Sequence, residues 1–270
     1  MESARPDEIE PLSNRLLIHR VARLLLPRAI AIGLHPNLVS AAGLSFGLLA
    51  ALAYTNWRDW RWATVGLLLM LCWHIMDGLD GKLARATGKC SALGRLLDGV
   101  ADYSTFVAVN LALAFTHPAP ALAVSVAIGS GICHALQSQF YEGERATYIR
   151  RRDGNFAAIE RTVAGGAVER LYNRCEAMLG NRTRRIDRLL AAAPAAGQAA
   201  ILARWRPSAA RVLRAMSPLS ANGRTLAIWI AALAGDPMLY WIWEIGPLTL
   251  LALIAARTLR NVEAKASLAS

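Results

Sequence analysis

Four aspartates stand in two pairs on apolar sequence, Asp77 with Asp80 and Asp98 with Asp102. The first two are three residues apart and the second two are four apart, so on helices each pair projects from one face. A strongly apolar run, residues 62–76, precedes the first pair, and another apolar run follows the second pair. Carboxylates are expensive to bury in a membrane, so aspartates on membrane-spanning helices usually have a function.

The two pairs lie at matching depths if the loop between them marks one membrane face. A rise of about 1.5 Å per residue places Asp80 and Asp77 roughly 8 and 12 Å inward on the first helix. The same rise places Asp98 and Asp102 roughly 10 and 16 Å inward on the second helix. Four anions that converge in a medium of low dielectric need compensating charge, which two divalent cations would supply. Ligation by oxygen alone favours Mg²⁺, Mn²⁺ or Ca²⁺ over Zn²⁺.

The residues between the two pairs suit a pyrophosphate substrate. Divalent ions bridged by carboxylates neutralise phosphate oxygens and stabilise a phosphate leaving group. Arg85 follows Asp80 by about one helical turn and can hydrogen-bond to phosphate. Gly81 and Gly94 have no side chain, so a ligand or a neighbouring helix can approach them closely.

This segment resembles, at every signature position, the CDP-alcohol phosphotransferase family of integral membrane enzymes. The resemblance implies a membrane fold of six helices with a dinuclear Mg²⁺ or Mn²⁺ site. It further implies a CDP-linked donor whose phosphoryl-lipid group is transferred to an alcohol, with release of CMP. A homodimer is suggested by the resemblance alone. The matching positions are Asp77, Asp80, Gly81, Ala84, Arg85, Gly94, Asp98 and Asp102.

The resemblance also implies a role for each matching residue. Asp77, Asp80 and Asp98 would be metal ligands. Asp102 would deprotonate the acceptor hydroxyl and would also contact metal. The remaining signature residues would shape the nucleotide-binding site: Gly81, Ala84, Arg85 and Gly94.

Two other interpretations of the aspartates remain open. A lone aspartate on an apolar helix is often a buried structural group, although four at these spacings are not typical of that role. Carboxylates in membranes also mark ion pathways, which leaves a cation carrier as an alternative. Gly81, Arg85 and Gly94 have no obvious part in a carrier, whereas each has one around a pyrophosphate.

The composition is that of a polytopic membrane protein. The 270 residues are 55% hydrophobic, with a mean hydropathy of +0.32, and both values exceed those of typical soluble proteins. The net charge of +11 does not indicate nucleic-acid binding, because the basic residues cluster beside apolar helices, where anionic lipid headgroups attract them. The four cysteines lack metal-ligand or redox spacing, so we expect free thiols. Residues 1–11 lack the basic start and apolar core of a cleavable signal.

We predict an all-α membrane protein with six transmembrane helices. Residues 12–33 interleave leucines with arginines in an amphipathic pattern that is interrupted at Pro27. They are too charged to span, so we expect an amphipathic helix on the membrane interface. Residues 142–217 are a polar insert, with three short helices expected at about 156–180, 182–193 and 197–216. The predicted spans are about 37–54, 62–85, 92–115, 119–141, 221–235 and 238–257, and we expect the fourth helix to continue beyond its span into the basic run 150–152.

The predicted organisation follows from these segments. An interfacial segment and four spans that carry the motif come first, then a cytoplasmic insert, two more spans and a polar tail. These parts cover residues 1–35, 36–141, 142–217, 218–257 and 258–270.

The distribution of basic residues predicts the orientation. Arginine and lysine are frequent in 1–35, in the insert and in the tail, and the motif loop 86–91 carries Lys89 with Arg85 and Arg95 on either side. They are absent from the connections between the third and fourth and the fifth and sixth spans. The positive-inside rule then places both termini and the motif loop in the cytoplasm, where soluble cytidine-linked donors and small acceptors are found. We therefore expect an integral protein of the bacterial inner membrane, with a cytoplasmic entrance to the active site.

The predicted reaction is transfer of a phosphatidyl group from CDP-diacylglycerol to a small polar alcohol. Basic residues near the motif favour a phosphorylated acceptor such as glycerol phosphate or inositol phosphate. The alternative is transfer of a CDP-linked headgroup, such as choline or ethanolamine, to a lipid alcohol. His74, one turn before Asp77, could orient a metal ligand or simply pack. The candidate acceptor-binding residues are Lys82, Lys89, Arg95 and His134.

Overall fold

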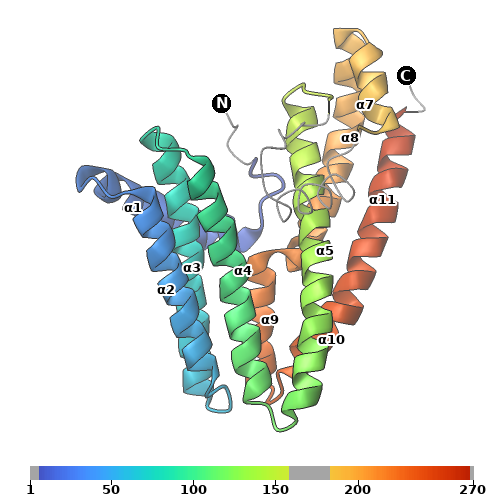
Figure 1. Cartoon of the computed structure of the whole chain (residues 1–270). Helices are drawn as coiled ribbons and strands as arrows, with labels where there is room; N and C mark the ends of the chain where they lie inside the picture. The colour runs from blue at the N-terminus through green and yellow to red at the C-terminus, as the bar shows by residue number, and fades with distance from the viewer. Residues whose placement is uncertain (1–5, 158–182, 268–270) are drawn as a thin grey trace. The chain divides into compact units, whose positions relative to one another are not determined.

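The computed structural model describes residues 6–157 and 183–267, apart from the side chains of residues 92, 93 and 95–98. Regular structure in these residues is helical, with no β-strand among them, which confirms the predicted all-α class (Figure 1). The prediction of an integral membrane protein is supported by four helical stretches that are long and apolar enough to cross a membrane. These are Pro36–Tyr54, Trp60–Ala86, Pro120–Arg152 and Met238–Ser267.

The other two predicted spans are also helices. Helix α4 (Ala92–Phe115) has 24 residues, with Gly99–Phe115 as its apolar stretch among the residues whose side chains are described, and α9 (Ala221–Leu233) has 13 residues. A helix that crosses the hydrocarbon core upright needs about 20 residues. The count of six spans therefore stays a prediction.

One compact unit of the chain comprises Leu12–Gly131 and Ala221–Ile245. Its helices include α1 (His19–Ala31), α2 (Pro36–Tyr54), α3 (Trp60–Ala86), α4 and α9. Helix α2 packs against both α3 and α4, while α1 and α9 contact α3 (Figure 1). Aromatic side chains fill the core where these helices meet, among them Tyr54, Trp73 and Phe106.

Local sequence sets where the helices beside the motif begin. Helix α2 starts at Pro36, whose fixed φ suits a first helical position, and the His35 ring accepts a hydrogen bond from the Asn37 backbone. Asp59 caps α3 by accepting a bond from the Arg61 N–H at 2.9 Å. Ser91 caps α4 in the same way, so both aspartate-bearing helices have defined starts.

Glycines bring α2 close to its neighbours. A Cβ on Gly47 would lie 2.2 Å from Thr105 Oγ1, and one on Gly43 would lie 3.3 Å from Met76 Cβ. The backbone of α2 therefore contacts side chains of α4 and α3 directly, as is common between membrane helices that meet at small residues. Gly66 serves the same purpose for the Tyr54 ring, because a Cβ there would lie 2.7 Å from it.

The second unit comprises Ile132–Ser220 and Gly246–Ser270 together with the N-terminal Met1–Pro11, so far as these are described. It contains the C-terminal part of α5 (Pro120–Arg152), α7 (Arg185–Ala192), α8 (Ala195–Ala215) and α11 (Thr249–Ser267). A π-helical turn, η3 (Glu244–Leu248), precedes α11. Helices α7 and α8 agree with the second and third helices expected in the insert, whereas the expected helix 156–180 lies almost wholly outside the described residues.

Helix α5 continues past the predicted fourth span, which ends near residue 141, into the basic run that ends at Arg152, as the sequence predicted. It continues because its polar side chains are buried in ion pairs rather than exposed. Arg151 donates to Asp187 Oδ1 at 2.7 Å and to Glu263 Oε1 at 2.7 Å, which joins α5 to α7 and α11. Arg145 likewise pairs with Glu10 at 2.8 Å.

The N-terminal helix differs in detail. Residues Asn14–Ile18 form a π-helical turn, and α1 runs without a break through Pro27, where the amphipathic sequence pattern is interrupted. Leu16 and Leu24 are exposed, which suits the predicted interfacial position, and that position stays a prediction. The described cysteines Cys72, Cys90 and Cys133 are free, while Cys175 lies outside the described residues.

Replacing Gly47 with alanine should lower the thermal stability of the protein in detergent, because the new Cβ overlaps Thr105. Overpacking of this kind costs about 1–3 kcal/mol. Gly131→Ala is the matched control, since a Cβ at Gly131 meets nothing within 4 Å in the described structure. Adding Thr105→Ala to Gly47→Ala should recover part of the loss. Equal melting temperatures for Gly47→Ala and Gly131→Ala would contradict the close packing.

Asp187 gives a pH-dependent prediction. Burial acts to raise the pKa of this carboxyl, but the hydrogen bonds and charge of Arg151, with smaller help from the Arg184 backbone N–H and from Arg150, lower it below its ordinary value. Its stabilising contribution is therefore complete above the unfolded pKa of about 3.9 and is lost as the pH falls through the lowered folded pKa.

Asp187→Asn should accordingly destabilise the protein by about 3–5 kcal/mol near neutral pH. Its melting temperature should approach that of the wild type as the pH drops below about 4. Asp153→Asn is the control, because Asp153 pairs with Arg152 at an exposed position where such pairs contribute about 0–1 kcal/mol. A constant difference between wild type and Asp187→Asn from pH 7 to pH 3 would refute the assignment.

Candidate active site

Three of the four motif aspartates line one small cavity. Asp77 and Asp80 come from α3 and Asp102 from α4, and the cavity has a volume of about 10 Å³. That volume corresponds to roughly one water-sized particle. Its other lining residues are Ser40 and Gly43 of α2, Trp73 of α3 and Ala101 of α4. The predicted convergence of the two helices is therefore seen for these three carboxylates.

Ser40 is a site residue that the sequence argument did not identify. Its hydroxyl donates a hydrogen bond to Asp80 Oδ2, and Asp80 is buried, with 6% of its surface exposed. The bond fixes one carboxylate from a third helix. The sequence feature that could have identified Ser40 is the helical spacing of three small residues on α2, Ser40, Gly43 and Gly47.

Arg85 lies beside the first aspartate pair. A Cβ on Gly81 would lie 3.4 Å from Arg85 Nη1, so the guanidinium folds back over Gly81, the residue after Asp80. The Arg85 side chain is exposed and Ala84 is half-buried on the same helix. This arrangement places a cation next to the carboxylates, where it could hydrogen-bond to a phosphate.

Gly94 lies where the first turn of α4 meets the start of α2. Its backbone N–H donates to Ser91 Oγ at 2.9 Å, and a Cβ on it would lie 3.5 Å from Asn37 Oδ1. The fourth aspartate, Asp98, belongs to the next turn of this helix. The side chains of Asp98 and Arg95 lie outside the described residues, so their predicted roles stay predictions.

The three candidate acceptor residues whose side chains are described, Lys82, Lys89 and His134, do not line the aspartate cavity. Lys82 Nζ lies 3.0 Å from His19 Nδ1 and 3.0 Å from the Gly78 carbonyl, so it holds α1 against α3. Lys89 is exposed in the loop before α4, and His134 is half-buried in the other unit.

His74 does not line the aspartate cavity either. It is buried, and its Nε2 lies 2.9 Å from Thr225 Oγ1. The bond links α3 to α9. Because Asp77 makes no part of that contact, the geometry favours a packing role for His74 over one in orienting a metal ligand.

The donor atoms around the cavity fit a hard divalent cation. The polar side chains that line it are three aspartates and a serine, without thiol or imidazole, and Mg²⁺ and Mn²⁺ prefer oxygen ligands. Within the described side chains, which leave out that of Asp98, no group of three or more histidine, cysteine, aspartate or glutamate residues is close enough to hold a metal ion. The residues thus have the right chemistry, and the described set falls short of a complete ligand shell.

Comparison with known proteins bears on the same segment. Residues 33–147 match the family model of the CDP-alcohol phosphatidyltransferases, which confirms the resemblance recognised in the motif. The match spans α2, α3, α4 and most of α5, and includes all four aspartates. Such enzymes act in membranes and transfer a phosphatidyl group from a CDP-alcohol to an alcohol, generally with divalent metal ions. The chain matches no curated protein and no solved structure.

Ser40→Ala should weaken binding of Mn²⁺ by about 10- to 100-fold, the usual effect of removing a residue that orients a metal-ligating carboxylate. Ser45→Ala is the matched control, since Ser45 is exposed on the same helix and its hydroxyl donates only to the Ala41 carbonyl, at 3.0 Å. Mn²⁺ titration of purified protein measures both variants. If they bind Mn²⁺ equally well, Ser40 has no part in the site.

Proposed function

We propose that this chain is a membrane-embedded enzyme that transfers the phosphatidyl group of CDP-diacylglycerol to a small polar alcohol and releases CMP. The observation that carries the proposal is the cavity shared by Asp77, Asp80 and Asp102. The family match over the same residues supports the reaction class. A structural role for the aspartates would not require three carboxylates from two helices to line one cavity.

The four aspartates would hold Mg²⁺ or Mn²⁺, with Asp77, Asp80 and Asp98 as ligands and Asp102 as a further contact. When bound, such ions neutralise pyrophosphate oxygens and stabilise the departing phosphate. Ser40 would keep the Asp80 carboxylate oriented through its hydrogen bond. Helices α3 and α4 would then supply the carboxylates, and α2 would orient one of them through Ser40.

Asp102 would act as the general base. It would accept the proton of the acceptor hydroxyl, whose oxygen forms a new bond to the phosphorus next to the lipid while the phosphoanhydride bond to CMP breaks. Arg85 would hydrogen-bond to the donor phosphates, because its exposed guanidinium lies over Gly81 beside the aspartates. Gly81, Ala84 and Gly94 would leave space for the nucleotide.

The proposal extends to location. Both termini and the loop between α3 and α4 would face the cytoplasm of a bacterium, and the acceptor would be glycerol phosphate, inositol phosphate or a similar alcohol. Lys82 is held by His19 in the structure, so Lys89 and Arg95 are the stronger candidates for binding an acceptor phosphate. We also propose a homodimer, on the family resemblance alone.

A CMP-release assay decides between the functions. Purified protein with Mg²⁺ should release CMP from CDP-diacylglycerol in the presence of a suitable alcohol. Release only from CDP-choline or CDP-ethanolamine, with a lipid alcohol as acceptor, would favour headgroup transfer instead. Ion flux into liposomes without any nucleotide turnover would favour a cation carrier.

Asp77→Asn and Asp98→Asn should each reduce Mg²⁺-dependent CMP release to background while the protein stays folded in detergent. Removing one charge from a shared metal site lowers the affinity for divalent ions, and turnover depends on them. The measurement is CMP release together with a melting curve for each variant. Full activity in either variant would refute its role as a metal ligand.

Asp102→Asn separates the base from the metal ligands. The variant should bind donor and Mg²⁺ while its turnover falls by about 10²–10⁴-fold, the usual contribution of one proton transfer. Donor binding is measured as thermal stabilisation by CDP-diacylglycerol in Mg²⁺. If binding and turnover are lost together, Asp102 is chiefly a metal ligand, and wild-type turnover would place the base elsewhere.

A further inference from the structure

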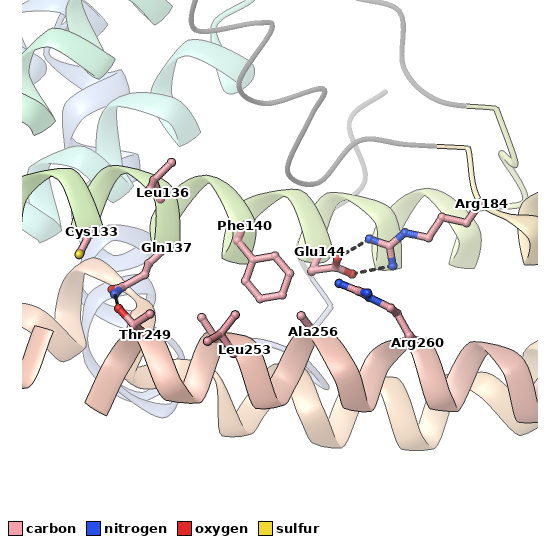
Figure 2. Close-up of a pocket in the computed structure, with 11 residues that line it drawn as sticks. Cys133, Leu136, Gln137, Phe140, Glu144, Arg184, Thr249, Leu253, Ala256 and Arg260 are labelled. Carbon is pink, nitrogen blue, oxygen red and sulfur yellow. Dashed lines mark hydrogen bonds and ion pairs between the residues drawn. The ribbon is translucent and has the colours of Figure 1, made fainter. Parts of the chain in front are cut away.

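A groove lies between α5 and α11 within the unit formed by Ile132–Ser220 and Gly246–Ser270 (Figure 2). Its volume is about 590 Å³, far larger than the aspartate cavity, and it is open along one side. Apolar side chains from both helices line most of its length: Leu136, Phe140, Ala252, Leu253 and Ala256. Leu136 and Leu253 are exposed, so the groove opens at the apolar surface of two helices long enough to span a membrane.

Polar groups mark the two ends of the groove. At one end Gln137 of α5 donates a hydrogen bond to Thr249 Oγ1 of α11 at 3.0 Å. At the other end lie Glu144, Arg184 and Arg260 (Figure 2). From Thr249 to Arg260 the rise along α11 is roughly 16 Å. The groove is therefore an extended apolar slot of about that length, with a charged end.

The charges at that end are not balanced. Arg184 hydrogen-bonds to the Glu144 carboxylate and pairs with Glu263 at 2.8 Å, so its charge is compensated within the protein. Arg260 is exposed, and among the described residues it forms no ion pair or hydrogen bond through its guanidinium. This end of the groove therefore has one uncompensated cation, that of Arg260. Arg184 closes the groove at the same end, because its ion pairs join α5 to α11.

We propose that this groove binds an anionic phospholipid, with an acyl chain against Leu136, Phe140 and Leu253 and the phosphate at Arg260. An apolar slot that ends in a cation matches an amphipathic ligand whose head is negative. Guanidinium groups bind phosphate through charge-assisted hydrogen bonds, and basic pockets between membrane helices are recognised lipid-headgroup sites. The lipid stays bound and takes no part in phosphatidyl transfer, so this site is a function additional to the one proposed above.

The test is native mass spectrometry of the full-length protein, delipidated in a neutral detergent and titrated with phosphatidylglycerol or phosphatidylcholine. The wild type should bind one phosphatidylglycerol at about tenfold lower concentration than phosphatidylcholine, the effect expected from one charge-assisted contact. Arg260→Gln should abolish that preference. Arg257→Gln is the matched control, since Arg257 is exposed three residues earlier on α11 and does not line the groove.

A second variant tests the slot itself. Ala256→Phe keeps Arg260 and fills the groove from α11, so binding of both lipids should fall by about tenfold while the melting temperature of the lipid-free protein is retained. Equal losses in Arg257→Gln and Arg260→Gln would overturn the proposal, because they would show attraction to surface charge in general. One-for-one displacement of phosphatidylglycerol by CDP-diacylglycerol would also overturn it, because the groove would then belong to the donor. All these measurements are of binding, so they stand whether or not the transferase assay succeeds.

Discussion

The close approach of α2 to α3 and α4 is the constraint on which the site depends. Gly43 and Gly47 let the backbone of α2 touch side chains of both aspartate-bearing helices, and one turn before Gly43 the Ser40 hydroxyl reaches Asp80. A bulkier residue at either glycine would push the helices apart. The Asp77–Asp80–Asp102 cavity would then lose a wall, because α2 contributes two of its lining residues.

Much of the site could be predicted from sequence because the helical spacing of the aspartates occurs next to long apolar runs. Spacings of three and four residues put each aspartate pair on one helix face, and apolar flanks place both faces at a similar depth. Ser40 was missed because it precedes the motif by nearly forty residues, and only tertiary packing brings it to Asp80. The acceptor candidates could not be ranked from sequence, because the sequence does not show whether a lysine is solvated or paired. In the structure, Lys82 contacts His19.

The fold was predictable where hydropathy decides it, whereas the pairing of charges between helices was not. The positions of α2 and α3 follow from apolar runs with defined caps. The continuation of α5 into the basic run 150–152 was also predicted. Composition alone, however, cannot show that Arg151 has its charge compensated by Asp187 and Glu263 from other helices, so the burial of this polar stretch in the second unit could only be seen in the structure.

The buried pairing of Arg151 with Asp187 also bears on how the chain is made. The two residues are 36 positions apart, and Arg151 is synthesised first. At about 5–20 residues per second, Arg151 waits roughly 2–7 s before Asp187 exists. During that interval the arginines at the end of α5 have no Asp187 to pair with, so their charges need water or anionic headgroups as partners. After Asp187 has been made, Arg150 and Arg151 can be buried, so the same residues are solvated early in synthesis and lie in the interior afterwards.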